Sequence, residues 1–138
     1  MKDEQYYTLT GYKRKNKYTI TETMEDYIEM IYRNTKEKEE ITIKDLSILL
    51  NVRPSSVSKM INKLNKLNIV NFKKYGQISL TEKGKKLGYF YLDRHNTLTT
   101  FFKMLNKNQF KLEQVEKIEH FVDKITINNI KKKKKNDN

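Results

Sequence analysis

The three residues Asn51-Val52-Arg53 connect two stretches of helical periodicity, and this short connection constrains the fold more than any other feature of the sequence. Before it, Leu46, Leu49 and Leu50 recur on one helical face. After it, Pro54 suits a first helical turn and opens a second apolar stripe, which comprises Val57, Met60, Ile61, Leu64 and Leu67. Three residues allow only a tight turn between two helices, so the sequence predicts a helix–turn–helix.

The segments on either side of this unit predict a winged helix–turn–helix, a mainly α fold with a small β-wing. Upstream, residues 21–40 have helical spacing with Thr21 or Thr23 as the N-cap, and the inward row is Met24, Tyr27, Ile28, Ile31 and Tyr32. Downstream, residues 69–80 predict two short strands in a hairpin around Tyr75-Gly76-Gln77. Three helices followed by a two-stranded wing are the element order of that fold.

The remainder of the chain predicts a helical region and a tail. Residues 81–105 return to helical spacing, with an inward row of Leu87, Tyr91, Leu98, Phe102 and Leu105. A last helix is expected over residues 112–125, with a short turn to Ile130, before a run of five lysines. We therefore expect four parts: a flexible N-terminal extension (1–19), a winged helix–turn–helix (20–86), a helical domain (87–130) and a disordered lysine-rich tail (131–138).

The distribution of charge predicts a nucleic-acid partner. The net charge is +12, and residues 53–86 hold nine basic residues against one acid, whereas residues 21–40 hold seven acids against three bases. Lysine-rich composition alone would explain the total but not this segregation. The exposed face of the second helix of the unit, a solvated face in the bland interpretation, carries groups that suit base edges and phosphates: Ser55, Ser56, Ser58, Lys59, Asn62 and Lys63. Lys73 and Lys74 add cations on the wing.

Composition also excludes several classes of protein. There is no cysteine, which excludes disulfides and thiolate metal sites such as zinc fingers. The apolar runs are too short to span a membrane, so we expect a cytoplasmic protein without a membrane partner. The basic tail could bind an acidic membrane surface, but a solvated tail is the simpler interpretation. With 138 residues the chain forms one compact unit or two small lobes, and dimerisation is plausible.

Six acidic and imidazole side chains fall on inward-facing positions of three predicted helices. Glu116, Glu119 and His120 share one helical face along an apolar stripe, Asp26 and Glu29 are spaced i, i+3 on the first helix, and His95 lies between Tyr91 and Leu98. Each element alone has an ordinary explanation, a satisfied core histidine or an acid placed at a helix N-terminus. Together they form a sulfur-free oxygen and nitrogen set that suits Mn²⁺ or Fe²⁺, with four negative charges that two divalent cations would neutralise.

At these residues the sequence closely resembles the diphtheria-toxin-repressor (DtxR/MntR) family of metal-dependent transcriptional regulators, in its manganese-sensing (MntR-like) branch. The matching stretches are "TMEDYIEMIY", "PSSVSKM", "LTEKGKKLG", "RH" at 94–95 and "IEHF", and they extend from about residue 20 to 125. Iron-sensing relatives have a methionine at the position of Asp26 and a cysteine at that of Glu116, which favours manganese here.

The resemblance implies a site, an assembly and a target. It implies that Asp26, Glu29, His95, Glu116, Glu119 and His120 bind Mn²⁺, two ions per subunit, with Fe²⁺ or another divalent cation as the alternative. It also implies a homodimer built from the C-terminal helices, and a double-stranded DNA operator near metal-uptake genes.

The expected function is therefore a manganese-responsive repressor, in which Mn²⁺ is a corepressor that fixes the spacing of two recognition helices. A metal-independent winged-helix regulator would pair the inward acids with lysines. A small metal-dependent hydrolase would need a cleft and a catalytic base, and the sequence offers no such additional group. We expect neither an enzyme nor a small organic substrate.

Overall fold

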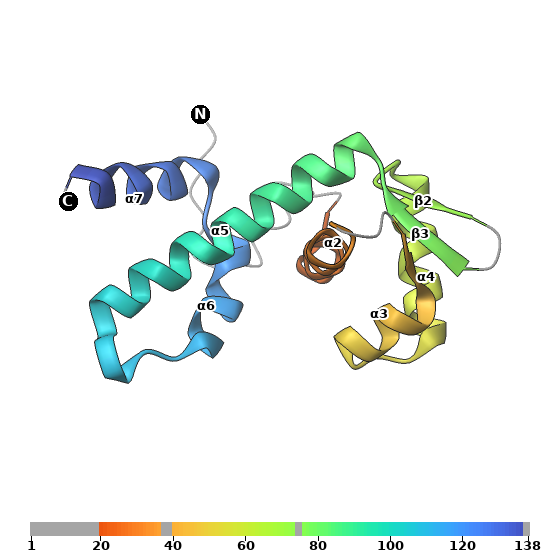
Figure 1. Cartoon of the computed structure of the whole chain (residues 1–138), viewed down its shortest axis with the longest axis horizontal. Coiled ribbons are helices and arrows are strands. Elements are labelled where there is room, and N and C mark those ends of the chain that lie inside the picture. The colour runs from red at the N-terminus through yellow and green to blue at the C-terminus, as the bar shows by residue number, and fades with distance from the viewer. Residues whose placement is uncertain (1–19, 37–39, 74–75, 137–138) are drawn as a thin grey trace, which may run out of the picture.

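The computed structural model describes residues 20–36, 40–73 and 76–136 (Figure 1). The helices are α2 (Glu22–Asn34), α3 (Ile43–Leu50), α4 (Pro54–Lys66), α5 (Glu82–Asn106), α6 (Leu112–Ile118) and α7 (Lys124–Asn136), with short 3-10 turns η2 (Lys107–Gln109) and η3 (Glu119–Phe121). The strands are β1 (Ile41–Thr42), β2 (Val70–Phe72) and β3 (Gln77–Leu80). The predicted flexible extension over residues 1–19 lies outside the described residues.

The helix–turn–helix has local signals at both ends of its turn. Thr42 caps α3 in a reciprocal arrangement with Asp45: the Thr42 hydroxyl accepts from the Asp45 amide, and the Asp45 carboxylate accepts from the Thr42 amide. α3 ends at Leu50, and its C-cap residue Asn51 takes a left-handed backbone conformation with φ 55°. Pro54 is the first residue of α4. The predicted helix–turn–helix is confirmed.

The wing is a three-stranded antiparallel sheet in the order β1-β3-β2. Ile41 lies opposite Ile78, and Val70 lies opposite Leu80. The sequence predicted β2 and β3 but not β1, because a two-residue strand is too short to show an alternating pattern and forms only by pairing with β3. The predicted first helix is also shorter than expected, ending at Asn34 rather than continuing towards residue 40.

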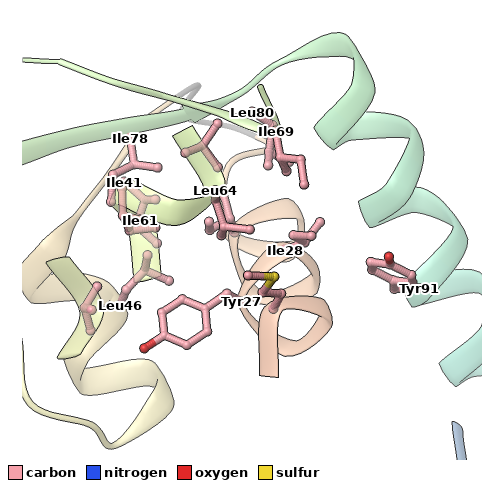
Figure 2. Packing of buried hydrophobic residues seen from close by; sticks show 14 residues of the cluster. Tyr27, Ile28, Ile41, Leu46, Ile61, Leu64, Ile69, Ile78, Leu80 and Tyr91 are labelled. Atoms are coloured by element: carbon pink, nitrogen blue, oxygen red, sulfur yellow. The ribbon is translucent and has the colours of Figure 1, made fainter. Parts of the chain in front are cut away.

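Two hydrophobic cores follow one another along α5. Figure 2 shows the larger core, in which α2, α3, α4 and the sheet pack together and to which α5 contributes Tyr91. The smaller core contains Leu98 of α5, Val115 of α6 and Ile127 of α7. Since Tyr91 and Leu98 are two turns apart on one continuous helix, α5 joins the helix–turn–helix to the C-terminal region.

α2 and α5 cross at very short range. A Cβ atom added to Gly88 of α5 would lie 2.6 Å from the Cβ atom of Tyr32 on α2, so only glycine allows this approach. The crossing holds α2 against α5 at Gly88, in the first half of that helix (Figure 1).

Several predictions about the C-terminal half are wrong. The last helix is not continuous from 112 to 125: α6 ends at Ile118, the turn η3 follows, and a new helix begins at Lys124. The reason is a second N-terminal capping signal, because the Asp123 carboxylate accepts a hydrogen bond of 2.8 Å from the Thr126 amide. The break turns Ile125 out to solvent, with 71% of its surface exposed.

The lysine-rich tail, predicted to be disordered from residue 131, continues α7 as a helix through Asn136. Lysine is a good helix former, Ile127 and Ile130 anchor the preceding turns in the smaller core, and Lys131 forms an ion pair with Asp93 of α5. Two predicted inward leucines, Leu49 and Leu105, are also exposed. Among the residues that the structure describes, none of the helices combines the length and the apolar character that a membrane crossing requires.

Candidate metal centre

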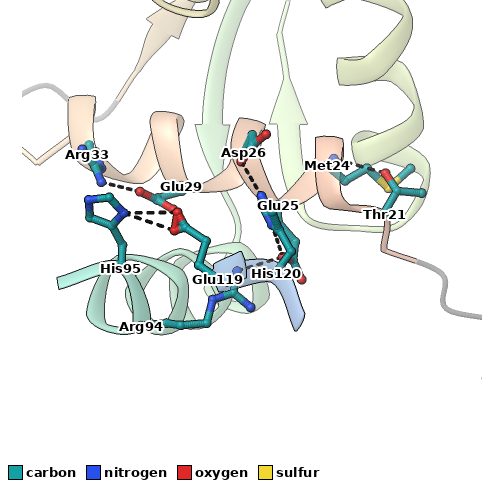
Figure 3. Close-up of polar contacts among 10 residues, drawn as sticks. All are labelled: Thr21, Met24, Glu25, Asp26, Glu29, Arg33, Arg94, His95, Glu119 and His120. Atoms are coloured by element: carbon teal, nitrogen blue, oxygen red, sulfur yellow. Dashed lines mark hydrogen bonds and ion pairs between the residues drawn. The ribbon is translucent and has the colours of Figure 1, made fainter. Parts of the chain in front are cut away.

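Helix α2 presents the two N-terminal candidate ligands towards the C-terminal region. The Thr21 hydroxyl caps the helix by accepting a hydrogen bond from the Met24 amide at 3.2 Å. The larger core buries one face of α2, through Tyr27 and Ile28. Asp26 and Glu29 lie one turn apart on another face, which meets α5 and η3 (Figure 3).

Four of the six predicted ligands form one group. Single ligand atoms of His95, Glu116 and Glu119 all lie within 4.8 Å of one another, and both carboxylate oxygens of Glu119 are 3.1 Å from Nδ1 of His95. Glu119 is almost completely buried, with 1% of its surface exposed. Figure 3 shows the carboxylate of Glu29 beside that of Glu119, and the negative charge of Glu119 acts on Glu29. α2, α5, α6 and η3 therefore all contribute to this group.

The other two predicted ligands face each other nearby. Nε2 of His120 is 3.2 Å from Oδ1 of Asp26, so η3 and α2 meet directly at this pair. Nδ1 of His120 is 2.7 Å from Oε1 of Glu25, and the same oxygen accepts a hydrogen bond of 2.8 Å from Nη2 of Arg94. The six predicted residues thus converge as two adjacent groups, joined by the consecutive residues Glu119 and His120.

Glu25 and Arg94 are residues that the sequence analysis missed. Arg94 is buried, and its guanidinium carbon lies 5.5 Å and 5.0 Å from the ring centroids of Phe90 and Tyr91. Each of the two residues immediately precedes a predicted ligand, Asp26 or His95. That adjacency was the only local signal, because a candidate ligand usually hydrogen bonds with a further polar side chain that orients it.

The pKa values of three side chains in the larger group are all raised. Burial, followed by the charge of Glu119, raises the pKa of Glu29, although Arg33 acts in the other direction. Burial and the hydrogen bond with Glu119 raise the pKa of Glu116 above its ordinary value. The hydrogen bond with Glu119 raises the pKa of His95. Each of these shifts favours bound protons, which is the response expected where carboxylates crowd together with too little positive charge.

His120 experiences the strongest effect in the smaller group. Its hydrogen bonds to Asp26 and then to Glu25 raise the pKa of the imidazole to about 10, against the opposing effect of burial. At neutral pH this arrangement therefore holds a positively charged group between two carboxylates.

The donor set fits a hard or borderline divalent cation. The ligand atoms of His95, Glu116 and Glu119 lie within 4.8 Å of one another, close enough to share one ion. All six candidates offer oxygen or imidazole nitrogen, the ligands that suit Mn²⁺ and Fe²⁺, and none offers sulfur. The candidate residues that the structure describes therefore fit such an ion in their chemistry, and three of them are already close together.

The predicted DNA-contacting face lies on the exposed side of α4. α4 buries Val57, Ile61 and Leu64, and its opposite face is exposed or half-buried, carrying Ser55, Ser56, Ser58, Lys59, Asn62 and Lys63. Lys73 is exposed on the wing, with its ammonium 3.6 Å from the Glu40 carboxylate. Lys74 lies outside the described residues. Figure 1 places α4 and α7 at opposite ends of the long helix α5.

Comparison with known proteins agrees with this arrangement. Residues 19–78 match the family described as "Iron dependent repressor, N-terminal DNA binding domain". A protein of Geobacillus thermodenitrificans named HTH-type transcriptional regulator MntR is 40% identical over 111 residues, which cover 80% of this chain and 79% of the relative. The protein of the same name from Bacillus subtilis is also 40% identical over 111 residues, covering 80% of this chain and 78% of the relative.

Solved structures share the fold. IdeR of T. acidophilum superposes with a TM-score of 0.65 and 26% identity, covering 79% of this chain and 52% of that one. The manganese regulator SloR gives a TM-score of 0.65 and 26% identity, covering 78% of this chain and 51% of that one. The chain thus spans about half the length of these two solved structures. The predicted fold class and family are confirmed: the chain belongs to the DtxR/MntR family of metal-dependent transcriptional regulators, which are DNA-binding proteins and not enzymes.

Proposed function

We propose that this chain is a manganese-responsive repressor in which Mn²⁺ acts as corepressor. The observation that carries the proposal is the convergence of Asp26 and Glu29, on a helix of the larger core, with side chains from α5, α6 and η3. A metal ion can control the relative position of the two regions of the molecule only if each region supplies some of its ligands.

The proposed ligands are Asp26, Glu29, His95, Glu116, Glu119 and His120, arranged for two ions per subunit. A bound divalent cation supplies positive charge to carboxylates that otherwise repel one another. Glu119 and His120 are positioned to act together, because they are consecutive in η3 and point to different partners, His95 and Asp26. Glu25 and Arg94 orient the His120 ring, leaving Nε2 directed at Asp26.

The proposed output is the spacing of two recognition helices. α2 packs in the same core as α3 and α4, so a shift of α2 relative to α5 moves the whole helix–turn–helix. In a homodimer formed through the C-terminal helices, the two copies of α4 must meet major grooves about 34 Å apart. The predicted contacts are the α4 residues Ser55, Ser56, Ser58, Lys59, Asn62 and Lys63, together with Lys73 and Lys74 of the wing.

Manganese is the proposed metal for two reasons. The relatives that are 40% identical are named MntR, and the structurally similar SloR is described as a manganese regulator. The second reason lies in the donor set, which contains carboxylate and imidazole groups without sulfur. Fe²⁺ is the closest alternative on ligand chemistry alone.

The test is operator binding with and without Mn²⁺. An operator is first selected from random duplex DNA with the full chain in Mn²⁺, and its Kd is then measured in Mn²⁺ and in chelator. We expect a difference of about 5- to 150-fold, the usual range for allosteric coupling. Glu119→Gln should abolish that difference. Glu113→Gln is the matched control, because Glu113 is an exposed acid of the neighbouring helix that pairs only locally with Lys117.

Equal affinity in Mn²⁺ and chelator would reject metal control. The chain would then be a metal-independent winged-helix regulator, and Glu119→Gln would bind the selected DNA as well as the unmodified protein.

A further inference from the structure

Two arginines lie beside the candidate metal centre, and they are held in different ways. Arg94 is buried, with 3% of its surface exposed, between aromatic rings and Glu25, which is not a candidate ligand. Arg33 is in the last turn of α2, with 37% of its side chain exposed, and its Nη2 donates to Oε2 of Glu29 at 2.5 Å. Glu29 is a candidate ligand, so Arg33 contacts the site itself (Figure 3).

Glu29 is mostly buried beside other candidate ligands, so its contact with Arg33 affects the candidate site. Only 13% of its side chain is exposed, and it interacts electrostatically with both Glu119 and His95. A guanidinium has no lone pair to offer a metal, so Arg33 cannot be a ligand. Its positive charge also repels any divalent cation that approaches the same carboxylate. Arg33 and a metal ion are therefore alternative partners for Oε2 of Glu29.

The exposure of Arg33 allows its side chain to move away from Glu29 into solvent. A half-exposed arginine at the end of a helix can rotate into water at little cost, whereas the buried Arg94 cannot leave without giving up its contacts with the aromatic rings and with Glu25. We propose that Arg33 is a built-in competitor that pairs with Glu29 until metal displaces it, and that it thereby raises the metal concentration needed to fill the site. This inference rests on the proposed function, because it requires Glu29 to be a ligand.

The test is Mn²⁺ affinity of the full chain with Arg33→Met, which keeps the apolar stem and removes the guanidinium. Since exposed ion pairs contribute modestly and this one is half-buried, we expect Mn²⁺ to bind about three- to tenfold more tightly, measured by calorimetry. Lys36→Met is the matched control: it also removes one positive charge near the end of α2, but the Lys36 ammonium lies over the Tyr32 ring, 5.4 Å from its centroid. Lys36→Met should change the affinity by less than twofold.

A second measurement separates competition from simple helix stabilisation. Arg33→Met should lower the Tm in chelator, because Glu29 then faces Glu119 without its partner, yet leave the Tm in saturating Mn²⁺ unchanged. An i, i+4 pair that only stabilises α2 would lower the Tm equally in both conditions. Arg33→Gln gives the same comparison with a polar replacement.

The outcomes distinguish the inference from the function on which it rests. Unchanged or weaker Mn²⁺ binding by Arg33→Met, in a protein that still binds Mn²⁺, overturns the role of Arg33 alone. Failure of the unmodified protein to bind Mn²⁺ overturns both.

Discussion

Replacing Gly88 with alanine tests whether the α2–α5 crossing fixes the metal centre. The added Cβ atom would lie 2.6 Å from the Cβ atom and 2.8 Å from the Cγ atom of Tyr32. Carbon atoms in contact are normally about 3.5–4.0 Å apart, so the two helices must separate by about 1 Å. Rotation of the tyrosine side chain cannot relieve the contact, because the Cβ atom of Tyr32 is fixed to the α2 backbone.

Two opposing effects decide the magnitude. Alanine in a helix interior is favoured over glycine by about 0.5–1 kcal/mol. Overpacking at a tight contact costs about 1–3 kcal/mol. The obstructing Cβ atom of Tyr32 is bonded directly to the α2 backbone and cannot rotate away. We therefore expect overpacking to prevail and the free energy of unfolding to fall by about 1–2 kcal/mol. The same displacement moves Asp26 and Glu29 away from His95 and His120, so Mn²⁺ affinity should fall as well.

The assay is urea denaturation in chelator, combined with Mn²⁺ titration. Asn96→Ala, at an exposed position of the same helix, is the control and should change stability by less than about 0.5 kcal/mol. Tyr32→Ala retains the Cβ atom, so it should recover only part of the loss in a double variant. A Gly88→Ala protein that is more stable, by the helix-propensity gain of about 0.5–1 kcal/mol, would refute the reasoning, since it would show that α2 and α5 separate freely.

Two further changes test the surroundings of the site. Glu25→Ala leaves the guanidinium of Arg94 buried without its carboxylate, which should cost about 3 kcal/mol in urea denaturation, and it should weaken Mn²⁺ binding about tenfold because His120 loses its orienting partner. Unchanged Mn²⁺ affinity would show that Glu25 is structural only. Asp123→Ala removes the cap of α7 and should speed hydrogen exchange at the Thr126 amide. That hydrogen bond lowers the pKa of Asp123, so the protection it gives should be full above the ordinary carboxyl pKa and should be lost as the pH falls through the lowered value.

The DNA-binding half of the fold was predictable because its signals are local. The three-residue connection, Pro54 at the start of α4 and the apolar stripes each act over a few residues, and the structure retains them apart from Leu49, which is exposed. β1 was not predictable, because Ile41 and Thr42 become a strand only by pairing with β3. The helical tail was missed for a related reason: a lysine run looks disordered until Ile127 and Ile130 anchor it in the smaller core.

The sequence predicted that the six candidate residues converge, but not the geometry in which they do so. The prediction placed Glu116, Glu119 and His120 on one continuous helical face, whereas Glu119 and His120 belong to a 3-10 turn. Successive residues in such a turn are about 120° apart, compared with about 100° in an α-helix, so the two side chains diverge further. Glu119 consequently reaches His95 while His120 reaches Asp26 and Glu25. The Asp123 cap, which requires the helix to stop before it, was the sequence signal for this break.

Positively charged groups already present around the candidate site affect the free energy of metal binding. On the sequence alone, four converging carboxylates require cations. The structure places other positive charge among them: the His120 imidazolium between Asp26 and Glu25, and the guanidinium of Arg33 on Glu29. On the proposed ligand set, a divalent ion would therefore replace protons and a guanidinium rather than neutralise isolated anions. Its affinity would then be a difference between two compensated arrangements, and under our proposal Arg33 tunes that difference from outside the proposed ligand set.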